Sequence, residues 1–174
     1  MEKDIDFVLV EERAFGDFAK ETAAVFSIAV VEHFGNAAGR NAVPLDEVEK
    51  SLRKRGSVVY AVFYHGQKIG GVVLNINPET RHNSMELFYI LPAFHGRGLG
   101  EIVWREIERR YPETRVWELV TPYFEKRNIH FYVNKCGFHI VEFFNAHHKA
   151  SGTSDDEPEF QKEFFRFEKR MKDS

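Results

Sequence analysis

The sequence has very little cysteine. Cys136 is the single cysteine among 174 residues, so no disulfide can form within the chain. A chain without internal disulfides fits a reducing compartment. The first residues, MEKDIDFVLVEE, are too acidic and their apolar run is too short for a secretory signal peptide. We therefore expect a cytoplasmic protein.

Long hydrophobic runs and an excess of positive charge are also lacking. No stretch approaches the roughly 18 consecutive apolar residues that a membrane-spanning helix needs. The net charge is −3 and the pI is about 6.2, whereas general nucleic-acid binders are usually basic. We therefore expect neither a membrane partner nor a nucleic-acid partner.

Motifs for metal binding and for nucleophilic catalysis are absent as well. The eight histidines show no metal-ligand spacing such as H-E-x-x-H, so we predict no metal site. No serine, histidine and aspartate set occurs in a nucleophile-elbow context. Cys136 directly precedes Gly137 at the predicted end of a helix, which favours a packed thiol over a reactive one.

Length and patterning predict a single domain over residues 1–174, large enough for a real core. The predicted order is a strand, two helices, three strands, a helix, a strand, a helix and two strands. The predicted strands are 5–11, 58–64, 68–76, 85–91, 115–121, 138–144 and 160–171, and the predicted helices are 14–34, 45–55, 99–111 and 125–136. Antiparallel hairpins flank a central strand–helix–strand unit, so we expect a mixed sheet.

One segment joins a strand to a helix through three glycines. The apolar stretch 85–91 ends at Pro92, and Leu99 begins a run with helical spacing. Glycine lets backbone N–H groups approach a ligand closely, and the first N–H groups of a helix lack intrahelical partners. The segment therefore predicts an anion site suited to a phosphate or a pyrophosphate. Its glycines are Gly96, Gly98 and Gly100.

Two common nucleotide-binding motifs do not fit this segment. The P-loop pattern G-x-x-x-x-G-K-[ST] is absent. The Rossmann fingerprint would need glycine at positions 96, 98 and 101, but residue 101 is Glu. An acid does follow Gly98 by twenty residues, at Glu118, but it lies within a predicted strand. A nucleotide-binding oxidoreductase is therefore a disfavoured alternative, and a helix-start turn without a ligand is the structural alternative.

The glycine segment resembles the acetyl-coenzyme A (acetyl-CoA) motif of the GNAT superfamily of N-acetyltransferases, [QR]-x-x-G-x-[GA]. The matching residues are His95, Gly96, Arg97, Gly98, Leu99 and Gly100. His95 replaces the usual Gln or Arg, at a position that contacts the ligand mainly through its backbone. A second segment, NIHFYVNKCGF, resembles the downstream motif of the family through Asn128, Phe131, Tyr132, Gly137 and Phe138. The predicted order of elements also matches the family fold.

The resemblance implies a GNAT-like fold and acetyl-CoA as the cosubstrate. The expected fold is a mixed α/β (α+β) one, with a mostly antiparallel central sheet of about seven strands, a splayed parallel pair and about four flanking helices. The pyrophosphate would meet the amides of the glycine segment, and the pantetheine arm would meet the backbone of Ile90 and Leu91. A main-chain N–H there can hold the thioester oxygen. The residues implied in binding acetyl-CoA are Ile90, Leu91, His95, Gly96, Arg97, Gly98, Leu99, Gly100, Asn128 and Phe131.

The resemblance also implies direct transfer of an acetyl group to a primary amine of a small molecule or peptide. A primary ammonium has a pKa near 10.4, so only about one molecule in a thousand is neutral at pH 7. Glu86 is the predicted base, because family members often use a carboxylate from this strand, and Glu118 is the second candidate. Strand alternation would place Glu86 on the face of Phe88 and Ile90. Tyr132 is the predicted acid that protonates the departing thiolate.

The acceptor side is less well specified by the sequence. The helix 14–34 and the loops 35–44 and 147–158 are expected to frame it. A homodimer is compatible with the sequence. The alternative function is a non-catalytic module on the same fold that senses acyl-coenzyme A, and the retained Tyr132 favours the enzyme.

Overall fold

The structure is a computed structural model that describes residues 4–35, 44–152 and 162–172. Its strands are β1 (Ile5–Leu9), β2 (Ser57–Tyr64), β3 (Gln67–Asn75), β4 (His82–Ile90), β5 (Val116–Pro122), β6 (His139–Phe144) and β7 (Phe164–Arg170). Its α-helices are α1 (Phe15–Phe34), α3 (Leu45–Arg53), α4 (Leu99–Arg110) and α5 (Lys126–His130). The predicted order of elements is confirmed. The predicted loops 35–44 and 147–158 and the predicted start of the last strand, 160–161, lie wholly or partly outside the described residues.

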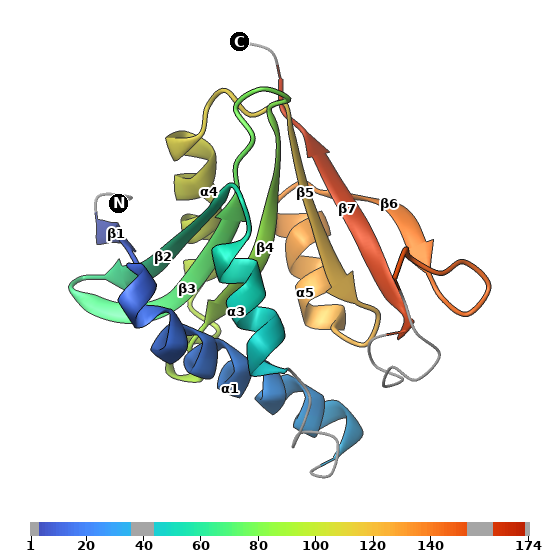
Figure 1. The fold of residues 1–174 in the computed structure, drawn as a ribbon, viewed down its shortest axis with the longest axis horizontal. Helices are drawn as coiled ribbons and strands as arrows, with labels where there is room; N and C mark the ends of the chain where they lie inside the picture. Colours follow the sequence, from blue (N-terminus) through green and yellow to red (C-terminus); the bar gives the residue numbers. More distant parts are fainter. Residues whose placement is uncertain (1–3, 36–43, 153–161, 173–174) are drawn as a thin grey trace.

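The seven strands form one sheet in the order β1-β2-β3-β4-β5-β7-β6 (Figure 1). β4 and β5 run parallel, and each other neighbouring pair is antiparallel. Parallel neighbours need a long crossover connection, and α4 provides it between β4 and β5. This mostly antiparallel sheet with its four α-helices confirms the predicted fold class.

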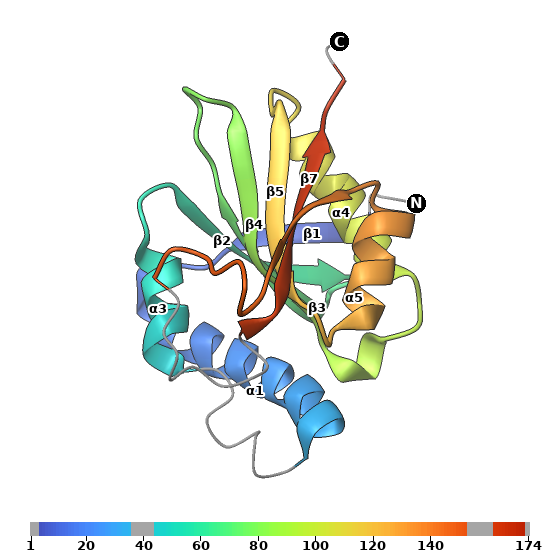
Figure 2. The same cartoon turned by 90° about the vertical axis from the view of Figure 1, so that its right-hand side faces the viewer.

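Helices cover both faces of the sheet (Figure 2), and each face has its own apolar core. On one face, α1 and α3 bury Phe18 and Leu52. On the other face, α4 and the segment after α5 bury Trp104, Ile107 and Phe138. Complete burial of one such side chain contributes about 1.5–3 kcal/mol, so the helices are held to the sheet mainly by these contacts. Among the described residues, no helix has both the length and the apolar character that crossing a membrane requires.

Gly71 of β3 determines how closely α1 approaches the sheet. A Cβ atom at this position would lie 2.6 Å from the Phe18 ring of α1 and 2.9 Å from the Tyr89 ring of β4. These distances are shorter than real carbon contacts, so only glycine allows the two rings to pack here. Sequence patterning gave no indication of this role.

β4 and β5 pair over three residues each and then diverge (Figure 1). The paired residues are His82 with Val116, Asn83 with Trp117, and Ser84 with Glu118. Beyond this short ladder β4 continues to Ile90 and β5 to Pro122. The predicted splayed pair is therefore confirmed, and it opens the sheet next to the glycine segment.

A β-bulge interrupts the alternation of β4. Leu74 pairs with Met85 and Val73 pairs with Leu87, so Glu86 is an extra residue between two paired positions. Met85 therefore packs into the core under α4, whereas Leu87 packs under α1 and α3. The continuous alternation that we predicted along this strand is wrong. Glu86 turns away from the α4 side and meets Lys54, the residue after α3.

The predicted helix 125–136 has two parts. α5 ends at His130, and a π-helical turn follows over Phe131–Lys135. The N–H of Phe138 then donates to the carbonyl of Tyr132 at 2.9 Å, and Gly137 between them has a φ of 85°. π-turns within helices are often found at functional sites. This one contains Tyr132, the predicted acid.

Candidate active site

The glycine segment begins where β4 ends. Gly96 and Gly98 have φ values of 76° and 72°, in the left-handed region that favours glycine, and α4 begins at Leu99. A Cβ atom at either glycine would find no heavy atom within 4 Å. Nothing therefore fills the space in front of these two glycines, and a ligand phosphate can approach them.

Gly100 has a different role from the first two glycines. A Cβ atom here would lie 3.1 Å from the Phe131 ring, which is closer than most carbon contacts. Glycine at this position therefore allows the ring to pack against α4. Phe131 in turn stacks on Phe88 of β4, with ring centroids 6.2 Å apart. Gly100 therefore packs α4 against the π-turn and β4.

The side chain of His95 reaches back to β4. Its Nε2 lies 2.6 Å from the carbonyl oxygen of Ile90, and Arg127 Nη2 lies 3.1 Å from its Nδ1. Because a guanidinium can only donate, Nδ1 accepts and Nε2 carries the proton that goes to Ile90. The sequence predicted a backbone role for position 95. The structure adds a side-chain link from the strand end to α5, through an arginine that we had not selected.

A cleft of about 1320 Å³ occupies the space between the diverging strands. It is lined by the predicted residues Glu86, Ile90, His95, Gly96, Arg97, Gly98, Leu99, Gly100, Asn128, Phe131 and Tyr132. Leu91 is not part of its lining. The N–H of Leu91 donates to the carbonyl of Ile69 at 2.7 Å, so that N–H is already used within the sheet.

Acidic and basic side chains from several elements line this cleft. We call the side formed by residues 95–100 the glycine wall. We call the side that carries four acidic residues from α1, α3, β4 and the segment after β5 the carboxylate wall. These acidic residues are Glu32, Glu47, Glu86 and Glu125. The glycine wall contributes His95 and Arg97, and Glu101 lines the cleft directly after it. The start of α5 contributes Lys126 and Arg127, which directly follow Glu125.

Tyr132 lines the cleft and is almost fully buried. Its side chain is 6% exposed and packs against the rings of Phe131, Phe138 and Phe167. Burial raises the pKa of its hydroxyl well above the ordinary value, and the nearby charges of Cys136 and Glu125 act in the same direction. The phenol is therefore protonated at neutral pH and can act as a proton donor.

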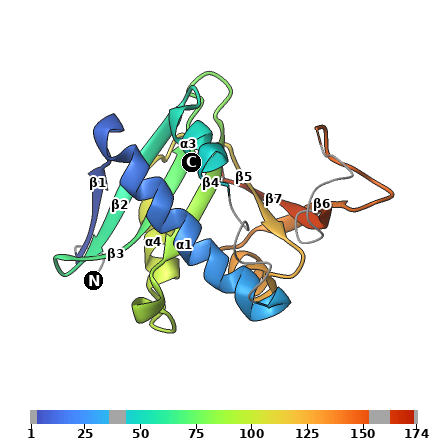
Figure 3. The ribbon, with the colours of Figure 1, turned by 60° about the horizontal axis from the view of Figure 1, so that its bottom comes forward.

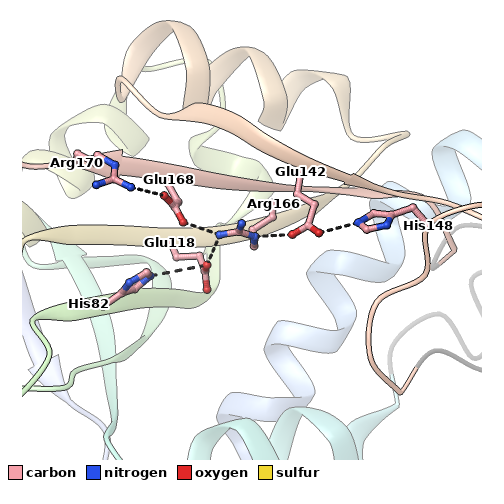
Figure 4. Close-up of polar contacts among 7 residues, drawn as sticks. All are labelled: His82, Glu118, Glu142, His148, Arg166, Glu168 and Arg170. Carbon is pink, nitrogen blue, oxygen red and sulfur yellow. Dashed lines mark hydrogen bonds and ion pairs between the residues drawn. The ribbon is translucent and has the colours of Figure 1, made fainter.

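The two carboxylates that the sequence singled out are both ion-paired. Lys54 Nζ lies 3.1 Å from Glu86 Oε1, within the carboxylate wall. Glu118 does not line the cleft. Arg166 Nη1 on β7 donates to its Oε1 at 2.7 Å, as part of a network that continues to Glu168 and Glu142 (Figure 4).

The same network contains a possible metal-ligand group among the described residues. His82, Glu118 and Glu168 each offer a ligand atom, and these atoms lie within 4.8 Å of one another. The guanidinium of Arg166 already donates to both carboxylates (Figure 4). Because the arginine supplies the positive charge that a cation would bring, we propose no metal site there.

Glu125 is a cleft carboxylate that sequence reasoning missed. It directly precedes α5 and its side chain is half-buried. Burial raises the pKa of its carboxyl, Arg127 opposes this rise, Glu32 adds to it and His33 opposes it. In the sequence it was only an acid at the start of a predicted helix, because the residues that bury it come from distant elements.

The C-terminal end of α1 lies near the helix α5 (Figure 3), and residues of α1 line the cleft. The Phe124 ring lies 5.2 Å from the His33 ring and 5.0 Å from the Phe34 ring, centroid to centroid. We call this contact the aromatic clasp. It brings α1 over the start of α5 and covers that end of the cleft.

A sheet that splays between two parallel strands, with a glycine-rich helix start at the opening, defines a coenzyme A-dependent acetyltransferase fold. The family model described as the acetyltransferase (GNAT) family matches residues 22–138. The chain belongs to the GNAT acetyltransferase family, as its two motifs implied.

Known proteins resemble the chain along most of its length. YrkN, an uncharacterized protein of Bacillus subtilis strain 168, is 47% identical, and the match covers 94% of this chain and 92% of the relative. An acetyltransferase from Thermus thermophilus has a TM-score of 0.67 at 14% identity, over 96% of this chain and 97% of its own. A spermidine N-acetyltransferase from Vibrio cholerae, solved with CoA and spermine, has a TM-score of 0.66 at 14% identity, over 97% of this chain and 96% of its own.

The solved structures confirm the fold. Several of them hold CoA or acetyl-CoA, which supports acetyl-CoA as the cosubstrate of this fold.

Proposed function

We propose that the protein is an N-acetyltransferase that moves an acetyl group from acetyl-CoA directly to a primary amine. One observation carries the proposal: a single cleft is bordered by open backbone at Gly96 and Gly98 and by the buried hydroxyl-bearing side chain of Tyr132. Phosphate binding and proton donation are thereby available at two places in the same cavity.

The residues of the glycine wall fit the phosphates of acetyl-CoA. The space before Gly96 and Gly98 is open, and α4 begins directly after them, so free N–H groups and a positive helix end face the same region. Arg97 and Arg127 can add charge-assisted hydrogen bonds to phosphate oxygens. Ile90, Asn128 and Phe131 would hold the pantetheine arm further along the cleft. When bound there, acetyl-CoA supplies the activated acetyl group.

Tyr132 and a cleft carboxylate then supply the proton transfers. The acceptor arrives mostly as an ammonium and must lose a proton before it can attack. Glu86 was predicted from the sequence for this role. Tyr132 is protonated at neutral pH already at the ordinary tyrosine pKa near 10, and burial raises its pKa further. It can therefore protonate the thiolate when the carbon–sulfur bond breaks.

The carboxylate wall suits an acceptor with positive charge. Its acidic residues come from four separate elements that converge on the cleft. An ammonium group would be attracted to them before it reaches the thioester. The Vibrio cholerae neighbour, with spermine bound, is an example of this fold with a cationic amine. A substrate screen would identify the particular amine.

Two measurements test the proposed function together. Calorimetric titration should show binding of acetyl-CoA and CoA, and no comparable binding of NAD. Thiol release should then be followed with spermidine, lysine and short peptides that have a free α-amine, and the N-acetylated product should be identified by mass spectrometry. Binding of acetyl-CoA without release of thiol for any amine would support the acyl-CoA sensor instead. Binding of NAD alone would reject the family-based assignment of the glycine segment.

A further inference from the structure

The three carboxylates near the β4–β5 opening differ in their partners. Glu86 is ion-paired to Lys54, and Glu118 is held by Arg166 outside the cleft. Glu125 lines the cleft, and none of the described residues places a cation within ion-pair distance of its carboxylate. Of the three, Glu125 therefore combines a place in the cleft with freedom from a fixed counter-ion.

The surroundings of Glu125 suit a group that gains and loses a proton. The charges of Glu32 and His33 on α1 and of Arg127 on α5 influence the pKa of Glu125. The charge of Glu125 in turn influences the pKa of Tyr132 in the π-turn. The aromatic clasp between α1 and Phe124 covers this end of the cleft. Glu125 and Tyr132, the group that we propose as the acid, line the same cleft, and the charge of Glu125 contributes to the raised pKa of Tyr132. The backbone is also fixed, because the N–H of Glu125 donates to the carbonyl of Pro122 and its carbonyl accepts from Ile129.

We propose that Glu125, rather than Glu86, is the catalytic residue that binds the acceptor ammonium and takes its proton. This inference rests on the proposed function. A base whose pKa is raised toward neutral pH accepts a proton more readily than an ordinary carboxylate, so the burial of Glu125 supports the role.

The proton balance of this step is complete. The ammonium gives one proton to Glu125, and Glu125 passes that proton to solvent through the open side of the cleft. The neutral amine forms the carbon–nitrogen bond as the carbon–sulfur bond breaks. The thiolate gains a proton from Tyr132. The nitrogen loses a second proton, which returns through solvent to the Tyr132 phenolate and restores the acid. The net products are an N-acetyl amine, CoA with a free thiol, and one proton.

A pH-rate comparison of wild type with Glu125→Gln tests the proposal. The variant should lose at least about tenfold in kcat/KM near pH 7 for an alkylamine, and the loss should shrink as pH approaches the amine pKa near 10.4. A peptide α-amine, with a pKa near 7.7–8.0, should show a smaller loss at pH 7 because more of it is already neutral. The dissociation constant for acetyl-CoA should change little.

Matched variants separate the possible outcomes. Glu113→Gln changes an exposed glutamate outside the cleft and serves as the control. A pH-dependent loss in Glu86→Gln with none in Glu125→Gln would overturn our proposal and return the base role to Glu86. Equal pH profiles for Glu125→Gln and wild type would also overturn it, while wild-type turnover would keep the proposed function. If the wild type itself binds acetyl-CoA but acetylates no amine, the proposed function fails and the base role fails with it.

A stability measurement gives a readout that does not depend on turnover. Because burial raises the pKa of Glu125 in the folded state, the folded protein holds this proton more tightly than the unfolded chain does. The stabilisation from the protonated Glu125 carboxyl is therefore fully present below the ordinary glutamate pKa of about 4.3. It is lost as pH rises through the raised pKa of Glu125 in the folded state. Glu125→Gln should have a higher Tm than wild type at pH 7, and the difference should vanish near pH 4. A lower Tm at pH 7 would contradict a desolvated carboxylate in the cleft.

Discussion

The glycine wall and the carboxylate wall of the cleft are built from the chain in different ways. The glycine wall is one continuous segment, whose shape follows from the local conformations of Gly96 and Gly98. The carboxylate wall is assembled from α1, α3, the bulged part of β4 and the segment after β5. A short motif can therefore specify the first wall, whereas the second exists only after the fold has formed. A related chain can therefore keep the glycine wall while the residues of the carboxylate wall change independently.

The largest effect is expected at Tyr132, which lines the same cleft as both walls. Tyr132→Phe removes only the hydroxyl, so kcat should fall by about 10²–10⁴-fold if that group protonates the thiolate. The dissociation constant for acetyl-CoA should stay close to that of wild type. Steady-state kinetics and calorimetry would measure the two quantities. Tyr123→Phe is the control, because Tyr123 is exposed and does not line the cleft. Equal kcat values in all three proteins would leave Tyr132 as a packing residue.

A substitution in the glycine wall should weaken cosubstrate binding with less effect on the fold. Gly98→Asp would place a negative charge where a phosphate is expected to approach, and we expect affinity for acetyl-CoA to fall on the order of 100-fold, or about 2.7 kcal/mol. Gly98→Asn has nearly the same shape without the charge, and Asn tolerates the left-handed conformation. Calorimetry should therefore show a much smaller loss for Asn. Similar losses for the two variants would mean that shape, and not phosphate charge, sets binding here.

Substitutions in the packing around α1 should change the free energy of unfolding. Gly71→Ala adds a Cβ that meets the rings of Phe18 and Tyr89 at 2.6 and 2.9 Å, so the free energy of unfolding should fall by about 1–3 kcal/mol. Gly16→Ala is the contrasting change, because in α1 its Cβ would meet only Glu49 at 3.9 Å. That substitution should raise stability by about 0.4–1 kcal/mol. Urea unfolding would measure both, and a stabilised Gly71→Ala would show that α1 sits further from the sheet.

The smallest effect is expected for the ion pair of the carboxylate wall. Lys54→Met removes the partner of Glu86, and both side chains are partly solvent-exposed. Such pairs contribute about 0–1 kcal/mol, so the unfolding free energy should change by less than that. If Glu125 is the base, the pH profile of turnover should also keep its shape. A profile that shifts along the pH axis in Lys54→Met would instead connect Glu86 to the proton transfer.

The sequence was sufficient for most of the fold, because apolar periodicity, prolines and glycines are local signals. These signals predicted the order of all eleven main elements and the glycine segment, whereas the splayed pair was predicted from the family resemblance. The bulge at Glu86 was not, since it depends on how β3 pairs with β4. The use of the Leu91 N–H by Ile69 depends on the same pairing. Glu125 was missed for a related reason, because α1, about ninety residues earlier in the chain, packs against the neighbouring Phe124 and lines the same cleft.

The position of β7 also bears on the order in which the molecule can fold. β1 to β4 are consecutive antiparallel neighbours, so each can pair as soon as the next one exists. β5 and β6, in contrast, are both paired to β7, the last described strand of the chain. Until β7 has been synthesised, β5 has its three-residue ladder to β4 and β6 has an unpaired backbone. We expect the N-terminal half to fold first during translation and the unpaired strands to be the aggregation-prone part of the nascent protein.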